Sequence, residues 1–216
     1  MSRASRGTLT VALALALGAM LAVSPAGASS EAASGQAGAA PTASPAPAAA
    51  PTAVTDLLRQ PRVAGEGRLR WFGLQIYDAR LFVTPDGVDM DRWTRTPFAL
   101  ELRYARKLLG EDIAQASLKE MARMGFGTEA QRAGWLETMR RLFPDVIAGD
   151  RLTGVHLPEG RAVFYRNDTR IGRVEDRQFV EAFFAIWLDP RTVAPDLRRS
   201  LLADPAVTAR TGPAPR

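Results

Sequence analysis

The stretch that decides the fold runs from Gly149 to Pro190 and reads GDRLTGVHLPEGRAVFYRNDTRIGRVEDRQFVEAFFAIWLDP. In its first half, short runs rich in β-branched and aromatic residues are separated by turn-forming residues. Pro158-Glu159-Gly160 and Asn167-Asp168 are the two turns. This pattern predicts three neighbouring antiparallel strands, over residues 151–157, 161–165 and 171–174.

The second half of the stretch predicts a helix that packs on those strands. Asp176 stands where its side chain can accept hydrogen bonds from the first free amides of a helix. The apolar residues of this helix recur with the helical period and share one face: Phe179, Ala182, Phe183, Ile186 and Trp187. A meander that leads directly into an apolar helix is typical of an α+β domain, in which the helix covers an antiparallel sheet.

The order of these features resembles the chalcone isomerase-like family, specifically its secreted bacterial branch. The resemblance is carried by Gly149-Asp150, the meander and the run D-x-x-F-x-x-A-F-F-x-I-W-L-D-P over residues 176–190. It covers roughly residues 63–202. It implies an α+β fold, an antiparallel β-sheet packed against a layer of helices (an open-faced β-sandwich), with a ligand cleft between the two layers.

Upstream of this stretch, two segments alternate as strands do. Residues 68–83 predict two strands with a bulge or bend at Gly73, and they place Tyr77 on an apolar face with Ala79 and Leu81. Residues 98–104 place Tyr104 on the buried side. Helices are expected over residues 110–124, 128–142 and 195–202, the second opened by a capping box at Thr128.

The two ends of the chain differ in composition from the part between them. Residues 1–28 have the basic start, apolar run and small-residue cleavage site of a secretory signal peptide, which predicts a periplasmic or secreted protein. Residues 29–53 are rich in Ala, Pro and Ser and predict a disordered linker. The chalcone isomerase-like domain is then expected over residues 54–204 and a disordered tail over 205–216. No transmembrane segment is expected after cleavage; a signal segment retained as an anchor is the alternative.

The composition argues against several classes of function. The chain has 216 residues, a net charge of +5, one His and no Cys. A zinc site needs several His or Cys ligands, and no metal or other cofactor is expected. His156 has no nucleophile motif to serve and is expected to be structural or solvated. An exported chain without a basic stripe is not expected to bind nucleic acid.

The resemblance also implies an enzymatic alternative. Plant members of the family close a flavanone ring with an Arg and a Thr from neighbouring strands, a Tyr and an Asn from a helix, and a hydroxyl near the start of the core helix. Here Tyr77 stands in place of the strand Thr, and Gln178 in place of the core-helix hydroxyl. The only Asn, Asn167, lies on a turn. We therefore expect no chalcone cyclisation and assign no catalytic residue.

Other members of the family bind fatty acids, with an Arg and a Tyr at the carboxylate. The candidate ligand-binding residues of this chain are accordingly Tyr77, Arg80, Arg103, Tyr104 and Gln178. A buried phenol needs a hydrogen-bond partner, and an Arg can hold a carboxylate with two bonds. Strict alternation turns each Arg away from its neighbouring Tyr unless a bulge intervenes. The alternative is that the tyrosines are core residues and the arginines form surface ion pairs.

Three functions therefore remain. We expect a non-catalytic domain that binds a small apolar or amphipathic ligand such as a fatty acid, in a cavity of roughly several hundred Å³ with Tyr77 or Tyr104 at its wall. An isomerase or intramolecular lyase with a rebuilt site would add a group of perturbed pKa to that cavity. An envelope interaction module would have a filled core and an exposed apolar patch instead. The sequence names no protein partner.

Overall fold

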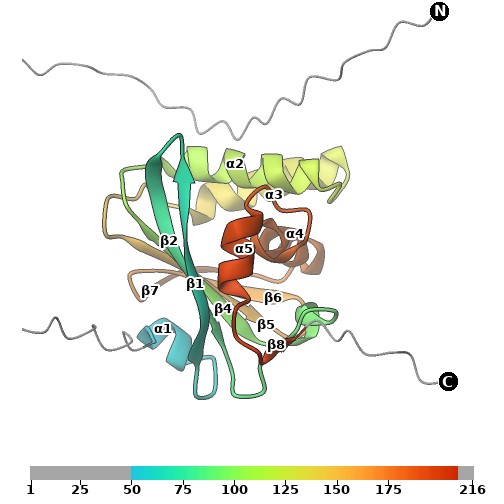
Figure 1. Ribbon diagram of the computed structural model, residues 1–216. Helices are drawn as coiled ribbons and strands as arrows, with labels where there is room; N and C mark the ends of the chain where they lie inside the picture. The colour runs from blue at the N-terminus through green and yellow to red at the C-terminus, as the bar shows by residue number, and fades with distance from the viewer. Residues whose placement is uncertain (1–49, 209–216) are drawn as a thin grey trace, which may run out of the picture. The chain divides into compact units, whose positions relative to one another are not determined.

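The computed structural model describes residues 50–208, which build a six-stranded antiparallel sheet and the helices packed on it (Figure 1). The order of strands across the sheet is β1-β2-β4-β5-β6-β7. Their bounds are β1 Arg62–Trp71, β2 Leu74–Val83, β4 Phe98–Tyr104, β5 Arg151–Leu157, β6 Arg161–Arg166 and β7 Thr169–Val174. The predicted antiparallel meander is therefore confirmed as β5, β6 and β7.

The helices are α1 Thr52–Thr55, α2 Gly110–Arg123, α3 Glu129–Leu142, α4 Arg177–Leu188 and α5 Pro195–Leu201, with a 3-10 turn, η1, at Trp93–Arg95. Two further short strands, β3 (Val88–Asp89) and β8 (Val207–Thr208), pair in parallel. The α+β class and the layer of helices on an antiparallel sheet are thus as expected. In residues 50–208, no helix is both long and apolar enough to cross a bilayer.

Helix α4 lies at the centre of the main core. Asp176 caps it as predicted, because its Oδ1 accepts from the amides of Gln178 (2.9 Å) and Phe179 (3.1 Å). The same carboxylate accepts from the indole of Trp135 on α3 (2.9 Å), which ties the two helices together. The ring of Phe183 contacts aromatic side chains of the sheet, of α4 itself and of the end of α3: Phe143, Phe164, Phe179, Phe184 and Trp187.

Local signals at the two outer helices also act as expected. Thr128 and Gln131 form a reciprocal capping box at the start of α3. Gly125, with φ +83°, follows α2 as a left-handed residue at the C-terminal end. These ends are set by contacts over three or four residues, which is why the sequence predicts them well.

Strand β1 is longer than predicted. It begins at Arg62 instead of residue 68, through the segment RVAGEG, whose two glycines weaken the strand pattern. The glycines permit a close approach of α5: a Cβ on Gly65 would lie 2.2 Å from the carbonyl oxygen of Ser200. Gly73 lies in a two-residue hairpin turn between β1 and β2, because Trp71 and Leu74 pair directly on either side of it.

The domain also extends beyond its predicted bounds at both ends. Helix α1 includes residues 52 and 53, and β8 includes residues 207 and 208; both were expected to be disordered. The reason is burial, since Val54 of α1 is buried with Phe82, Ala99 and Val155 on the sheet face opposite the main core, and Val207 pairs with Val88. The predicted signal peptide and most of the predicted linker and tail lie outside residues 50–208.

Candidate ligand-binding site

A cavity lies between the sheet and the helices, on the face that carries the main core. It is lined by residues of all six strands of the main sheet, of α2 and α4, and of the loop between α4 and α5, together with Leu108 and Phe143. Its volume is about 110 Å³, well above the roughly 10–15 Å³ that one water needs. It lies where the cleft was expected, but it is smaller than the predicted several hundred Å³.

Tyr77 and Tyr104 both line this cavity, as predicted. They are directly opposite each other on β2 and β4, and their rings meet edge to face with centroids 5.9 Å apart. The Tyr77 hydroxyl accepts a hydrogen bond from the indole Nε1 of Trp187 on α4 (3.0 Å). The sheet and the core helix therefore meet through a polar contact at the wall of the cavity.

The two phenols are held as hydrogen-bond donors. Burial raises the pKa of Tyr77, against a smaller lowering by the Trp187 hydrogen bond. Burial also raises the pKa of Tyr104, and the neighbouring Tyr77 raises it further. Both hydroxyls are thus protonated at any physiological pH. Within residues 50–208, no acceptor lies within hydrogen-bond distance of either O–H, although buried polar groups are normally satisfied.

Thr153 and Tyr165 border the cavity, but alternation turns their side chains to the opposite face of the sheet. The other polar side chains at the wall are already bonded within the fold. The Ser117 hydroxyl donates to the Ile113 carbonyl (2.8 Å), and the Thr192 hydroxyl donates to the Ile186 carbonyl (2.7 Å). Glu120 is the one charged residue among the lining residues, and Arg123 holds its carboxylate (2.9 Å). No Lys, Arg or His is among the residues that line the cavity. The wall therefore offers two neutral donors and no cation.

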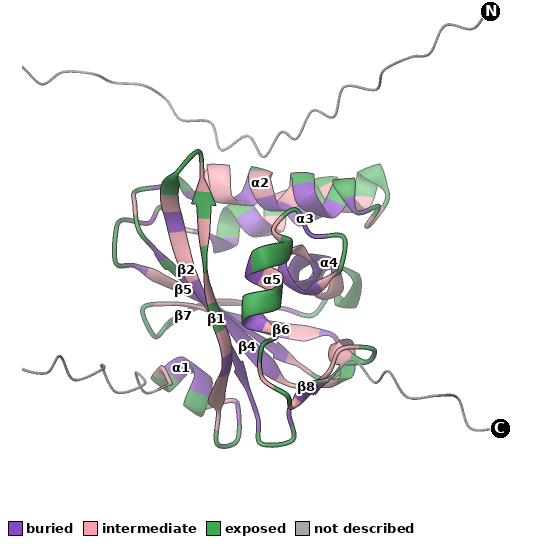
Figure 2. Cartoon of the chain, viewed as in Figure 1, coloured by how far each residue is buried: buried purple, intermediate pink, exposed green. Residues whose placement is uncertain are grey.

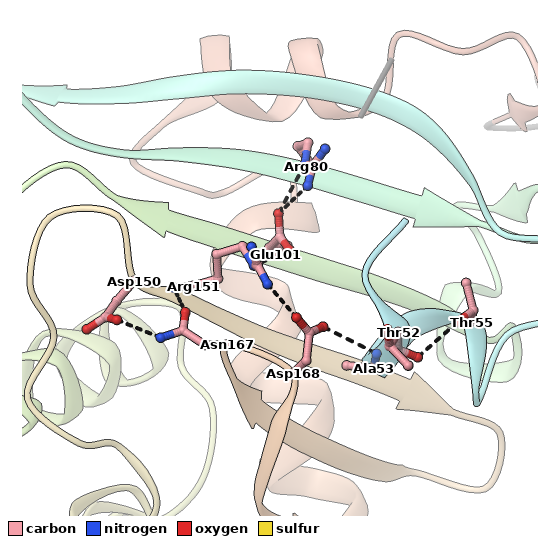
Figure 3. Close-up of polar contacts among 9 residues, drawn as sticks. All are labelled: Thr52, Ala53, Thr55, Arg80, Glu101, Asp150, Arg151, Asn167 and Asp168. Carbon is pink, nitrogen blue, oxygen red and sulfur yellow. Dashed lines mark hydrogen bonds and ion pairs between the residues drawn. The ribbon is translucent and has the colours of Figure 1, made fainter. Parts of the chain in front are cut away.

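Arg80 does not belong to this cavity. The pairing of β2 with β4 has no bulge along its whole length, so alternation from Tyr77 places Arg80 on the opposite face of the sheet. There its guanidinium donates to Oε1 of Glu101 (3.0 and 2.7 Å), a carboxylate that is 1% exposed (Figure 3). Arg151 lies beside the same Glu101 and pairs with Asp168, which accepts from the Ala53 amide of α1 (3.4 Å; Figure 3).

Arg103 and Gln178 are also outside the cavity. Arg103 is exposed on the same sheet face as Arg80, because it lies one residue before Tyr104 on β4. Gln178 is exposed at the start of α4, and its side-chain oxygen accepts from Nε2 of Gln131 on α3. Neither arginine therefore lies with the two tyrosines in the cavity, as strict alternation indicated.

The structure adds residues to the site that sequence reasoning missed. Trp187 was assigned to the core face of its helix, and its hydrogen bond to Tyr77 joins residues 110 positions apart. Ser117 and Glu120 share one face of α2 with the apolar Ala114 and Met121, a signal that was available in the sequence. Polar residues on an otherwise buried helix face are candidates for a cavity wall.

His156 was expected to be either structural or solvated, and the structure places it in the core. It is 1% exposed, stacks on Phe98 (centroids 4.7 Å apart) and meets Phe184 edge to face. Its Nδ1 bonds to the carbonyl of Thr96 (2.9 Å), which requires the proton on Nδ1. Burial lowers the pKa of His156 to about 4. It does not line the cavity, and residues 50–208 contain no cluster of three or more side chains suited to bind a metal ion.

Comparison with known proteins gives a consistent fold. A sequence model described as "Chalcone isomerase-like" matches residues 63–203. An uncharacterised protein of Haemophilus influenzae is 28% identical over 138 residues, which cover 64% of this chain and 66% of that protein, just under two thirds of its length. The crystal structure of a fatty-acid binding protein of Arabidopsis thaliana is similar at a TM-score of 0.56 and 13% identity, over 67% of this chain and 87% of that one.

Proposed function

Because this chain belongs to the chalcone isomerase-like family and its cavity presents two free phenol donors on an apolar wall, we propose that it binds a small apolar molecule with one hydrogen-bond acceptor. The single observation that carries the proposal is the pair Tyr77 and Tyr104. Both O–H groups border the cavity and have no acceptor among residues 50–208, and a bound carbonyl or ether oxygen would supply one.

The charge of the wall narrows the class of ligand. A buried carboxylate needs a cation or several donors to offset its desolvation. The lining residues hold no cation, and the nearby Arg123 is already paired with the one lining carboxylate, Glu120. The acceptor is therefore neutral: an ester, a ketone or a carboxylic acid bound in its protonated form. This refines the fatty-acid expectation.

The size of the cavity narrows the ligand further. At about 110 Å³ the cavity is smaller than the roughly 300–1,000 Å³ of pockets that hold drug-sized ligands. A medium-length acyl ester therefore fits the proposal better than a long-chain fatty acid does.

A binding role fits the cavity better than catalysis. Acid–base catalysis needs a group whose pKa lies near the working pH. The pKa of each cavity tyrosine is raised away from that range, and the carboxylate of Glu120 is engaged by Arg123. Export remains part of the proposal, supported by the signal-peptide pattern of residues 1–28.

The test is a binding titration of the full chain with methyl nonanoate and nonanoate, followed by native mass spectrometry and by quenching of tryptophan fluorescence, since Trp187 lies at the wall. We expect the ester to bind more tightly than the anion near neutral pH. Tyr104→Phe should weaken the ester by about fivefold to tenfold, the value of one hydrogen bond of about 1 kcal/mol.

Arg103→Gln is the matched control, because it changes a polar side chain on the other face of the same strand. It should leave the affinity unchanged. Equal loss in Arg103→Gln and Tyr104→Phe would place the ligand elsewhere. Failure of the wild-type chain to bind the ester would refute the proposed ligand class.

A further inference from the structure

The exposed apolar side chains of this domain gather at one end of the sheet. Four of the five large hydrophobic residues that are exposed within residues 50–208 lie there: Phe72, Leu74, Leu109 and Ile147. We call these four residues the apolar end. Phe72 is 88% exposed and Ile147 is 59% exposed. Figure 2 shows exposed residues at the tip of the β1–β2 hairpin, at the top of the view.

Backbone contacts hold the segments of the apolar end together. Phe72 and Leu74 belong to the hairpin between β1 and β2. The Ala105 amide donates to the Ile76 carbonyl (2.9 Å), which places the loop before α2 beside the base of that hairpin. Leu108 and Val146 pair as an isolated bridge, so Leu109 and Ile147 follow two neighbouring segments.

The backbone at Phe72 points to a role outside the fold. Phe72 has φ +47° and Gly73 has φ +77°, the left-handed pair that a two-residue hairpin turn requires. Such a turn favours Asn, Asp or Gly, and a bulky aromatic residue is disfavoured there. The β6–β7 hairpin of the same sheet makes the equivalent turn with Asn167 (φ +48°) and Asp168 (φ +70°).

The ring of Phe72 gains little from the fold in return for this strain. Its one aromatic contact among residues 50–208 is an edge-to-face pair with Trp71 (centroids 4.9 Å apart), and the side chain is almost fully exposed. Strained residues that persist without a structural benefit mark functional sites. An apolar surface of this kind indicates a binding partner.

The charges around the apolar end indicate the chemistry of that partner. Arg70, near the end of β1, and Lys107, in the loop before α2, are exposed and form no ion pair within residues 50–208. Nη1 of Arg70 lies 3.4 Å from the Gly73 carbonyl and so borders the tip. Of the nearby acids, Asp78 is paired with Arg68 (2.6 Å), whereas the exposed Asp145 accepts from the Gly110 amide (2.9 Å) and has no ion pair within residues 50–208. Aromatic residues at a tip flanked by free cations suit the interface of a bilayer that contains anionic lipids.

The apolar end is continuous with the cavity. Leu69 of β1 and Ile76 of β2, two residues from Trp71 and Leu74 respectively, line the cavity, as does Ile113 in the first turn of α2. A hairpin seated in a lipid surface would bring this side of the cavity to the source of apolar ligands. A protein partner would explain the exposed rings but not this continuity.

We infer that the apolar end, led by the hairpin tip at Phe72, docks on the surface of an anionic lipid bilayer. Phe72, Leu74 and Trp71 enter the interfacial region, and Arg70 and Lys107 contact lipid phosphates. The inference does not depend on the proposed ligand, because docking requires only the outer surface of the domain.

The test is co-sedimentation of the full chain with vesicles of phosphatidylcholine alone and of phosphatidylcholine mixed with phosphatidylglycerol. The N-terminus of every preparation is determined by mass spectrometry, so that variants are compared at equal length and any contribution of residues 1–28 is common to all. We expect binding to the mixed vesicles that weakens as sodium chloride is raised. Phe72→Asn should lower the partition coefficient by about tenfold.

Phe72→Asn also separates loss of docking from loss of folding. Asn suits the left-handed turn, so the thermal midpoint of this variant should be equal to that of the wild type or higher. Docking that is unchanged in Phe72→Asn would overturn the inference. The inference would also be overturned if the wild-type chain bound neither kind of vesicle, whether or not cross-linking then found a protein at Phe72.

A charge-matched pair tests the position of the contact. Lys107→Glu, after the end of β4, should weaken binding to the mixed vesicles by about fivefold or more. Arg95→Glu makes the same charge change before the start of β4, at the opposite end of the strand, and should leave binding within about twofold. An equal loss in the two variants would indicate attraction to the whole protein and refute docking through the apolar end.

Discussion

Acidification from about pH 7 to about pH 5 is expected to lower the free energy of unfolding by about 2 kcal/mol through His156 alone. Burial lowers the pKa of this side chain from 6.5 to about 4 in the folded protein. The unfolded chain therefore takes up a proton at a higher pH than the folded one. The stabilisation is fully present above about pH 6.5 and is lost as the pH falls toward 4, where the total loss reaches about 3 kcal/mol.

The surroundings of His156 explain why its protonation destabilises the folded protein. A proton on Nε2 would place a charge among Phe98, Trp93 and Phe184, whose rings surround the imidazole. The existing bond from Nδ1 to Thr96 favours the charged form, but it is outweighed by burial. Asp150, whose pKa is lowered to about 2 chiefly by its hydrogen bond from Asn167, contributes at lower pH.

The assay is urea unfolding followed by tryptophan fluorescence at the two pH values, with His156→Leu as the comparison. The chain has one histidine, so the variant removes the group that titrates in this range. His156→Leu should lose about 1 kcal/mol near pH 7, because the Thr96 carbonyl loses its donor. Between the two pH values it should lose about 2 kcal/mol less than the wild type. An equal loss in both proteins would refute this account.

Two further predictions concern packing and capping. Gly65→Ala should destabilise the domain by about 3 kcal/mol, because its Cβ would collide with backbone oxygens of α5. Gly134→Ala, on the open side of α3, should stabilise the domain by up to about 1 kcal/mol. The urea midpoints of the two variants should therefore shift in opposite directions. Asp176→Ala should lower the free energy of unfolding by about 2–3 kcal/mol, since it removes the cap of α4 and leaves the Trp135 indole without its acceptor. The control Asp196→Ala, at an exposed ion pair, should lower it by less than about 0.5 kcal/mol. Similar thermal melts for both Asp variants would contradict the second prediction.

Several parts of the fold were predictable because they depend on neighbours in the chain. The Asn167-Asp168 turn, the Thr128 capping box and the Asp176 cap are each formed within a few residues. The strict alternation of β2 and β4 also predicted that Arg80 and Arg103 would face away from the tyrosines, which is what the pairing shows. No bulge between β2 and β4 reverses this orientation.

Other parts depend on contacts between distant segments. Strand β1 begins early because α5, more than 100 residues later, packs against Gly65. Helix α1 is held by Asp168 and by the second face of the sheet, through contacts that no local pattern indicates. Residues 207 and 208 form a strand only because β3 is available to pair with them.

The sequence by itself therefore determined the α+β class, the meander, the core helix and the presence of Tyr77 and Tyr104 on an apolar face. The tertiary structure decided what that face encloses. It joined Tyr77 to Trp187 across 110 residues, left two phenol donors in a cavity without a cation, and gathered Phe72, Leu74, Leu109 and Ile147 at one end of the sheet. The physical reason is that periodicity sets the direction of a side chain, whereas its partners are set by chain segments that pack together only in the folded state.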